Sequence, residues 1–180
     1  TIFLYQGEEL GLPQSEIPFE LMQDPFGIAN WPLNPGRDGC RTPMPWRSEA
    51  PNVGFSAGTP WLPIDPAHVQ LAVDRQQANT RSMLQTARRL IALRRRLPAL
   101  RDGDSEILHA DGAALLMRRR CPEQTLCAAF NLSTQGQAIP MPEPVADAPV
   151  WQFGGALLHD RHLYLPGGAV WIAVDPPSPT

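Results

Sequence analysis

Apolar residues follow two different periods along this chain, and the period changes near residue 100. Over residues 80–97 they recur every three or four positions, at Met83, Leu84, Ala87, Leu90, Ile91 and Leu97. Arginines cover most of the other positions. This spacing predicts an amphipathic helix, with Asn79 as its cap and one stripe packed on the protein. Pro98 ends the helix, and a polar turn over residues 99–104 follows.

After that turn the period shortens to two, which is the spacing of strands. Eight short strands are predicted, over residues 105–110, 113–119, 125–131, 136–139, 150–153, 156–159, 162–165 and 169–174. Turn pairs such as Asp111-Gly112 separate them. We expect a small antiparallel β-sandwich over residues 101–175 and an unstructured tail over 176–180. His109, His159 and His162 lie at strand ends, and we interpret them as surface groups.

The chain opens on a β-branched and aromatic run over residues 1–6, which predicts a buried strand of a parallel sheet. Glu8 and Glu9 follow directly, at the end of a strand where α/β barrels carry their active sites. The alternative is that these carboxylates bind arginines or backbone amides of neighbouring loops, and we prefer it for Glu9. The chain has no initiator methionine, so we expect its true N-terminus to lie elsewhere.

Residues 12–66 form a long segment rich in proline and glycine. Turns are predicted at residues 24–27, 34–36 and 58–61, a brief helical turn at 17–23, and a helix start with Asp65 as cap and Pro66 in its first turn. Aromatic residues at this density imply packed surface and not disorder. They are Phe19, Phe26, Trp31, Trp46, Phe55 and Trp61.

Composition excludes several classes of function. The chain has 180 residues, of which 43% are hydrophobic, and a net charge of −3, so it gives no electrostatic reason to bind nucleic acid or an acidic membrane surface. No apolar run reaches the roughly 18 residues of a membrane span. Three irregularly spaced cysteines indicate neither a disulfide framework nor a metal site, and reduced thiols favour a cytoplasmic protein.

The stretch with most chemistry is Arg37-Asp38-Gly39-Cys40-Arg41-Thr42-Pro43-Met44-Pro45-Trp46. Charged groups stand on a backbone stiffened by proline, which is typical of a ligand-facing loop, although a structural knot of charges is the alternative. The stretch follows Tyr5-Gln6-Gly7-Glu8-Glu9-Leu10-Gly11-Leu12-Pro13 by about thirty residues. Together with Asp24-Pro25-Phe26-Gly27, the pair resembles the α-glucosidases of the α-amylase superfamily, glycoside hydrolase family 13. One departure is Ile2, where that family often has proline.

The resemblance implies an α/β region followed by an all-β one: residues 1–100 as the last strand, substrate loop and outer helix of a (β/α)8 barrel, and residues 101–175 as the C-terminal sandwich. It also implies retaining hydrolysis by an Asp nucleophile, a Glu acid/base and a stabilising Asp, all upstream of Thr1. No catalytic residue is therefore expected in this segment, and no metal or cofactor.

Substrate contacts are implied mainly for Arg37, whose fork-shaped guanidinium matches the family arginine that reaches sugar hydroxyls. Gln14 is a weaker candidate, because a plain surface glutamine explains it equally well. Asp38 and Arg41 are expected to hold Arg37 in place. Trp46, like Trp31, is expected to pack under the loop more than to stack on sugar.

The sequence thus favours the C-terminal part of a cytoplasmic, exo-acting α-glucosidase that cleaves short glucosides such as maltose. Its expected partners are a small oligosaccharide and the N-terminal remainder of its own barrel, with no nucleic acid or membrane. A transglycosylase or sugar isomerase of the same family stays open, as does a non-catalytic relative that binds a partner protein. A free-standing carbohydrate-binding sandwich explains only the last third.

Overall fold

In a computed structural model, which describes residues 2–141 and 148–175, the chain divides into two compact units. The first is Thr1–Ile91 and the second is Ala92–Thr180, so the division falls inside helix α4 (Met83–Arg96). Each unit has apolar clusters of its own. The expected tail at residues 176–180 lies outside the described residues.

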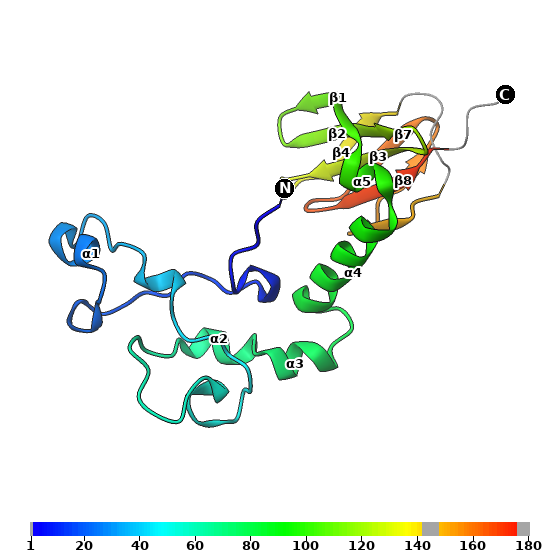
Figure 1. Cartoon of the computed structure of the whole chain (residues 1–180). Coiled ribbons are helices and arrows are strands. Elements are labelled where there is room, and N and C mark those ends of the chain that lie inside the picture. Colours follow the sequence, from blue (N-terminus) through cyan, green and yellow to red (C-terminus); the bar gives the residue numbers. More distant parts are fainter. Residues whose placement is uncertain (1, 142–147, 176–180) are drawn as a thin grey trace. The chain divides into compact units, whose positions relative to one another are not determined.

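The first unit consists of loops tied together by short helices (Figure 1). In chain order these are η1 (Glu8–Leu10), η2 (Phe19–Leu21), α1 (Pro25–Asn30), η3 (Asp38–Cys40), η4 (Pro51–Gly54), α2 (Pro66–Gln70) and α3 (Val73–Ala78). The brief helical turn predicted over residues 17–23 is confirmed by η2.

Helices α1 and α2 begin in the same way. Each has an aspartate at its N-cap and a proline at its first position, and the carboxylate accepts a hydrogen bond from the second helical N–H. Proline suits this position because the missing N–H would have no helical partner there. The predicted start at Asp65 is therefore confirmed. The turn predicted at residues 24–27 is instead the start of α1, with Asp24 as its cap.

The buried strand predicted over residues 1–6 is not formed. Ile2, Phe3, Leu4 and Tyr5 belong to no strand, and their exposed fractions run from 53% to 88%. A strand needs a neighbour to take up its backbone N–H and C=O groups, and none of the described residues supplies one here.

The first unit is held by two small aliphatic clusters. Leu10, Met44 and Leu84 form one, and Ile17, Met22 and Leu62 form the other. The six aromatic side chains expected to be packed are instead 45% to 59% exposed, so that prediction is wrong for the described chain. The aliphatic residues fill these small cores, and the rings of Phe19 and Trp31 contact each other with centroids 5.9 Å apart.

Helix α4 begins at Met83, three residues later than predicted. The Oγ atom of Ser82 accepts from the N–H of Gln85, whereas the expected cap, Asn79, accepts from the N–H of Arg81. Leu84 is buried as predicted, but Met83, Leu90 and Ile91 on the same stripe are 36% to 52% exposed. Much of the apolar stripe is therefore uncovered in this chain.

All eight predicted strands are present in the second unit. They are β1 (Asp104–Asp111), β2 (Ala114–Cys121), β3 (Gln124–Asn131), β4 (Gln137–Pro140), β5 (Trp151–Phe153), β6 (Leu157–His159), β7 (His162–Leu165) and β8 (Val170–Val174). They make an antiparallel five-stranded sheet, in the order β1-β2-β3-β8-β5, and a three-stranded sheet, β4-β7-β6 (Figure 1). Residues from both sheets form one core, with Trp171 only 1% exposed.

A second apolar cluster joins the five-stranded sheet to helical residues that precede it. Leu93 and Leu97 pack with Leu126 and Ile172. Ala99 belongs to the same cluster and lies in α5 (Pro98–Asp102), a short helix where a polar turn was predicted. Ala99 explains the difference, because it is 0% exposed within α5 and packs in this apolar cluster.

Candidate functional site

Two segments of the long loop, residues 23–24 and residues 37–38, are joined by hydrogen bonds to the side chains of Asp24 and Asp38. Asp38 is 0% exposed, and its Oδ2 atom accepts from the N–H groups of Gln23 at 2.6 Å and Asp24 at 2.8 Å. In return, Oδ2 of Asp24 accepts from the N–H of Arg37 at 2.9 Å. Each segment therefore supplies the acceptor for backbone donors of the other.

Arg37 lies next to these hydrogen bonds, and its side chain is 71% exposed. Its Nε atom lies 3.7 Å from Oδ2 of Asp24. The hydrogen bond from the Arg37 N–H holds the pKa of Asp24 below its usual value. The N–H of Phe26 and the charges of Arg37 and Arg41 add to this, against the cost of burial. The carboxylate beside Arg37 is thus Asp24. The expected partner, Asp38, acts on backbone groups, and Arg41 contributes its charge near Asp24.

Glycines allow the close approach of these segments. Gly36 has φ +71°, and a Cβ there would lie 2.8 Å from Oδ2 of Asp24. At Gly39 a Cβ would lie 2.3 Å from the carbonyl oxygen of Ser15. A side chain at either position would force the loop apart.

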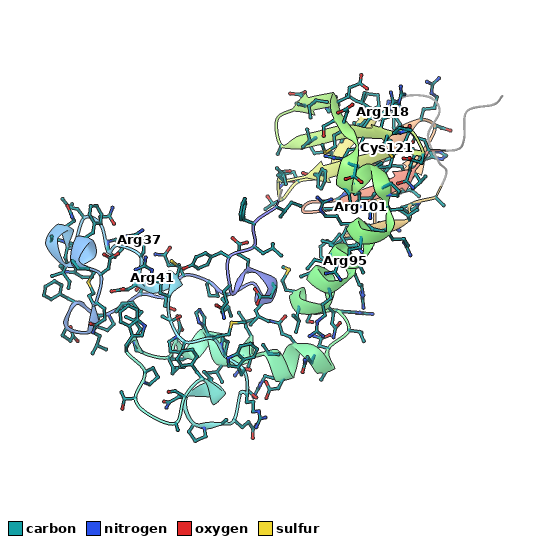
Figure 2. The ribbon with its side chains drawn as sticks, viewed as in Figure 1. Arg37, Arg41, Arg95, Arg101, Arg118 and Cys121 are labelled. Atoms are coloured by element: carbon teal, nitrogen blue, oxygen red, sulfur yellow. The ribbon has the colours of Figure 1, made fainter. Side chains whose placement is uncertain are left out.

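A pocket of about 810 Å³ lies beside the η3 turn. Its walls include Tyr5, Glu8, Gln14, Arg41, Phe55 and His68. The structure therefore brings two of the expected site residues together, Gln14 and Arg41. Arg37 is not among the residues that line this pocket. Arg37 is the N-cap residue of η3 and Arg41 is its C-cap residue. Figure 2 labels both of them in the first unit.

The paired carboxylates at the start of the chain bind backbone amides. Oε2 of Glu8 accepts from the N–H of Tyr5 at 3.2 Å, and Oε2 of Glu9 accepts from the N–H of Gly7 at 2.8 Å. Both therefore stabilise the turn in which they lie. This arrangement does not hold the two carboxylates apart across a sugar ring, as glycoside hydrolysis requires of its catalytic pair.

Trp46 holds the loop through its backbone. Its N–H donates to the carbonyl of Val53 at 2.9 Å, and its carbonyl accepts from the N–H of Asp74 at 3.2 Å, while its side chain is 45% exposed. Asn52 and Val53 both have φ +49°, in the left-handed region. A buried β-branched residue in that region is strained, so the contacts around Trp46 must outweigh the cost.

Two buried polar residues were not singled out from the sequence. His68 is 2% exposed; its Nε2 lies 2.8 Å from the carbonyl oxygen of Pro13, and its Nδ1 lies 3.4 Å from Oγ1 of Thr42. Because a carbonyl only accepts, Nε2 carries the proton. Gln76 donates to the carbonyls of Leu10 and Leu71 and accepts from the N–H of Leu84. Pro13 and Thr42 are distant from His68 in sequence, and Leu10 is distant from Gln76, so no local pattern marks these contacts.

Among the described residues, no three His, Cys, Asp or Glu side chains are grouped so that they could hold a metal ion. Cys40, Cys121 and Cys127 are all free thiols. Within the same residues, none of the helices combines the length and apolar character needed to cross a membrane.

The family model for the alpha amylase catalytic domain matches residues 1–103. The chain belongs to this alpha-amylase family. The predicted resemblance is confirmed, and with it the predicted fold class, in which the last part of an alpha-amylase barrel precedes an antiparallel sandwich.

Similar alpha-amylase family proteins are much longer than this chain. A probable alpha-glucosidase from Rhizobium meliloti (strain 1021) is 42% identical over 142 residues, which cover 79% of this chain and 26% of that protein. A probable oligo-1,6-glucosidase 2 from Bacillus subtilis (strain 168) is 30% identical over 162 residues, covering 79% and 29%. The crystal structure of XgtA, an alpha-glucosyl transfer enzyme, has a TM-score of 0.86 and 42% identity, covering 96% and 32%. The chain thus spans about a quarter to a third of these relatives.

Proposed function

We propose that this chain is the C-terminal part of a retaining α-glucosidase of glycoside hydrolase family 13, which releases terminal α-linked glucose from short oligosaccharides such as maltose. The observation that carries the proposal is the alpha amylase match over residues 1–103, joined to 42% identity with a probable alpha-glucosidase. Residues 1–100 would complete the barrel, and residues 101–175 would form the sandwich that follows it.

The uncovered apolar surfaces support this assignment. Ile2, Phe3 and Leu4 are 58% to 88% exposed, and Met83 and Ile91 on α4 are 52% and 40% exposed. Such residues fit surfaces that the N-terminal remainder of the barrel would cover. That remainder would also carry the three catalytic carboxylates, so the segment alone is expected to show no turnover of an aryl α-glucoside.

In this proposal the segment supplies one wall of the sugar-binding pocket. Arg37 offers an exposed guanidinium fork whose Nε lies beside a carboxylate, which suits hydrogen bonding to sugar hydroxyls. Gln14 and Arg41 line the neighbouring pocket, where an amide and a second guanidinium offer further hydrogen-bond donors. Asp38, Glu9 and Trp46 act as structural supports of the loop, each through backbone hydrogen bonds.

The test is Arg37→Ala in the full-length enzyme, with Arg88→Ala on the exposed face of α4 as the matched control. A hydrogen bond from a charged group is worth about 1.5–3 kcal/mol, so kcat/KM for maltose should fall by about 10- to 100-fold in Arg37→Ala only. The unfolding temperature should stay unchanged, because the side chain is 71% exposed. Unchanged kinetics for Arg37→Ala would refute its role in the site.

A second candidate is transfer of the glucosyl group to another sugar. The alpha-glucosyl transfer enzyme XgtA favours it, because it shares 42% identity and the fold with this chain. Chromatography of the products formed at high maltose concentration separates the two reactions. Hydrolysis yields glucose alone, whereas transfer also yields longer oligosaccharides. Absence of both products from the full-length protein would support a non-catalytic, partner-binding relative.

We also propose that the enzyme works in the cytoplasm. The free thiols of Cys40, Cys121 and Cys127 support a reducing compartment. Cell fractionation with an antibody to the sandwich would test this, and recovery from the culture medium would contradict it.

A further inference from the structure

The hydrogen bonds between residues 23–24 and residues 37–38 also place the Arg37 side chain beside Asp24. The Arg37 N–H and its Nε atom both face the same oxygen, Oδ2 of Asp24, at 2.9 Å and 3.7 Å. Asp38 in turn fixes the backbone of this segment, because its Oδ2 atom accepts one hydrogen bond from the N–H of Gln23 and one from the N–H of Asp24. We propose that Asp24, supported by Asp38, is a positioning residue that directs the Arg37 guanidinium toward the substrate.

This inference rests on the proposed sugar-binding role of Arg37. An exposed arginine samples many rotamers, and binding must then stop that motion. The contact with Asp24 uses Nε, and among the described residues the Nη groups of Arg37 make no hydrogen bond. The fork is thereby restrained at its base while its tip stays available, which lowers the cost of binding a sugar hydroxyl.

The two carboxylate oxygens of Asp24 accept hydrogen bonds from different parts of the chain. Oδ1 accepts from the N–H of Phe26 and caps helix α1, whereas Oδ2 serves Arg37. Asparagine is as good an N-cap as aspartate, so Asp24→Asn keeps the cap but loses the charge and the second acceptor. The structural and positioning roles can therefore be separated in one variant.

One oxygen of the Asp38 carboxylate destabilises the loop, which indicates that this residue is not present for stability alone. Asp38 is 0% exposed, and its Oδ1 atom has no hydrogen-bond partner among the described residues. A buried carboxylate oxygen without a donor is unfavourable. The chain keeps this group while its other oxygen binds the N–H groups of Gln23 and Asp24, next to the contact with Arg37.

The test is a double-mutant cycle in the full-length enzyme, with Asp24→Asn and Arg37→Ala singly and together, and with kcat and KM measured on maltose. We expect Asp24→Asn to lower kcat/KM about tenfold when Arg37 is present, and to change it less than twofold once Arg37 is alanine. Asp24→Asn should lower the unfolding temperature by the same amount in both backgrounds, because the cap on the Phe26 N–H is kept while the N–H of residue 37 loses its acceptor in each.

Asp65→Asn is the matched control, because Asp65 caps α2 ahead of a proline just as Asp24 caps α1. Its effect on kcat/KM should be the same with and without Arg37. Equal effects of Asp24→Asn in both backgrounds would overturn the positioning role while Arg37 stays a binding residue. If Arg37→Ala alone changes nothing, the proposed function of the site fails first, and the inference falls with it. If Asp24→Asn unfolds the protein, Asp24→Ser, which also keeps a cap, replaces it in the cycle.

Discussion

The Nε2 atom of His68 lies 2.8 Å from the carbonyl oxygen of Pro13, a residue 55 positions earlier. The same buried ring reaches Oγ1 of Thr42 at 3.4 Å. Pro13 precedes Gln14, and Thr42 follows Arg41, so one side chain supports the backbone beside two of the residues that line the 810 Å³ pocket. His68 is therefore a structural support of the pocket wall.

His68→Leu should loosen this wall. It removes the donor to Pro13 and leaves a carbonyl without a partner, which costs about 1–3 kcal/mol. The expected result is faster amide exchange at Ser15, whose N–H donates to the carbonyl of Gly39 at 3.0 Å. Hydrogen exchange read by mass spectrometry checks this. His159→Gln is the control, since that side chain is 69% exposed, and equal exchange in the two variants would contradict the assigned role.

The free thiols should differ in reactivity. Burial, with the charge of Asp175 beside it, raises the pKa of the Cys127 thiol to about 11. At pH 8 only about one Cys127 in a thousand is then a thiolate, the reactive form. Cys40 is exposed, so alkylation of the native protein should label it first and leave Cys127 unlabelled until denaturant is added. Peptide mapping reads the result, and early labelling of Cys127 would argue against its buried position in β3.

The sequence was most informative where structure depends on near neighbours. Period-two patterning placed all eight strands, and the Asp65-Pro66 pair marked the start of α2. It failed where distant contacts decide. Residues 2–5 have β-strand composition, yet a strand also requires a partner that the described chain does not supply. The Asp24–Arg37 and His68–Pro13 contacts join positions 13 and 55 residues apart, and no local pattern encodes them.

Arg119→Met should detach α5 from the sandwich. The Arg119 guanidinium donates to the carbonyls of Ala99 and Gly103 and to Oγ of Ser105, at 2.7, 2.5 and 2.9 Å. Methionine keeps the apolar stem and removes these donors, so local stability should fall by about 1.5–3 kcal/mol. Hydrogen exchange over residues 97–105 measures the change. Arg120→Met, in an exposed neighbour, should leave exchange there unaltered, and an equal response of both variants would contradict the prediction.

Two aspartates should give opposite pH dependences. A hydrogen bond from Ser15 lowers the pKa of Asp65 below its ordinary 3.8, so its stabilisation is present above pH 3.8 and is lost as the pH falls through the lower, folded-state pKa. Burial raises the pKa of Asp175, against the charge of Arg118, so its contribution is present below pH 3.8 and is lost as the pH rises through the raised pKa. Urea unfolding from pH 3 to 7 checks both signs. The free energy of unfolding of the unmodified protein, minus that of Asp65→Asn, should increase as the pH rises. The same difference taken against Asp175→Asn should decrease. The same sign for both differences would contradict the environments described for the two carboxyl groups.

The anomeric form of the first product tests the proposed retaining α-glucosidase most directly. Proton NMR of the full-length enzyme acting on an aryl α-glucoside, which releases a single glucose per turnover, resolves the α and β anomers of that glucose before mutarotation mixes them. A double displacement on carboxylates conserves configuration, so the glucose cleaved from the non-reducing end should appear first as the α anomer. Initial release of the β anomer, or no release of glucose, would contradict the proposed function.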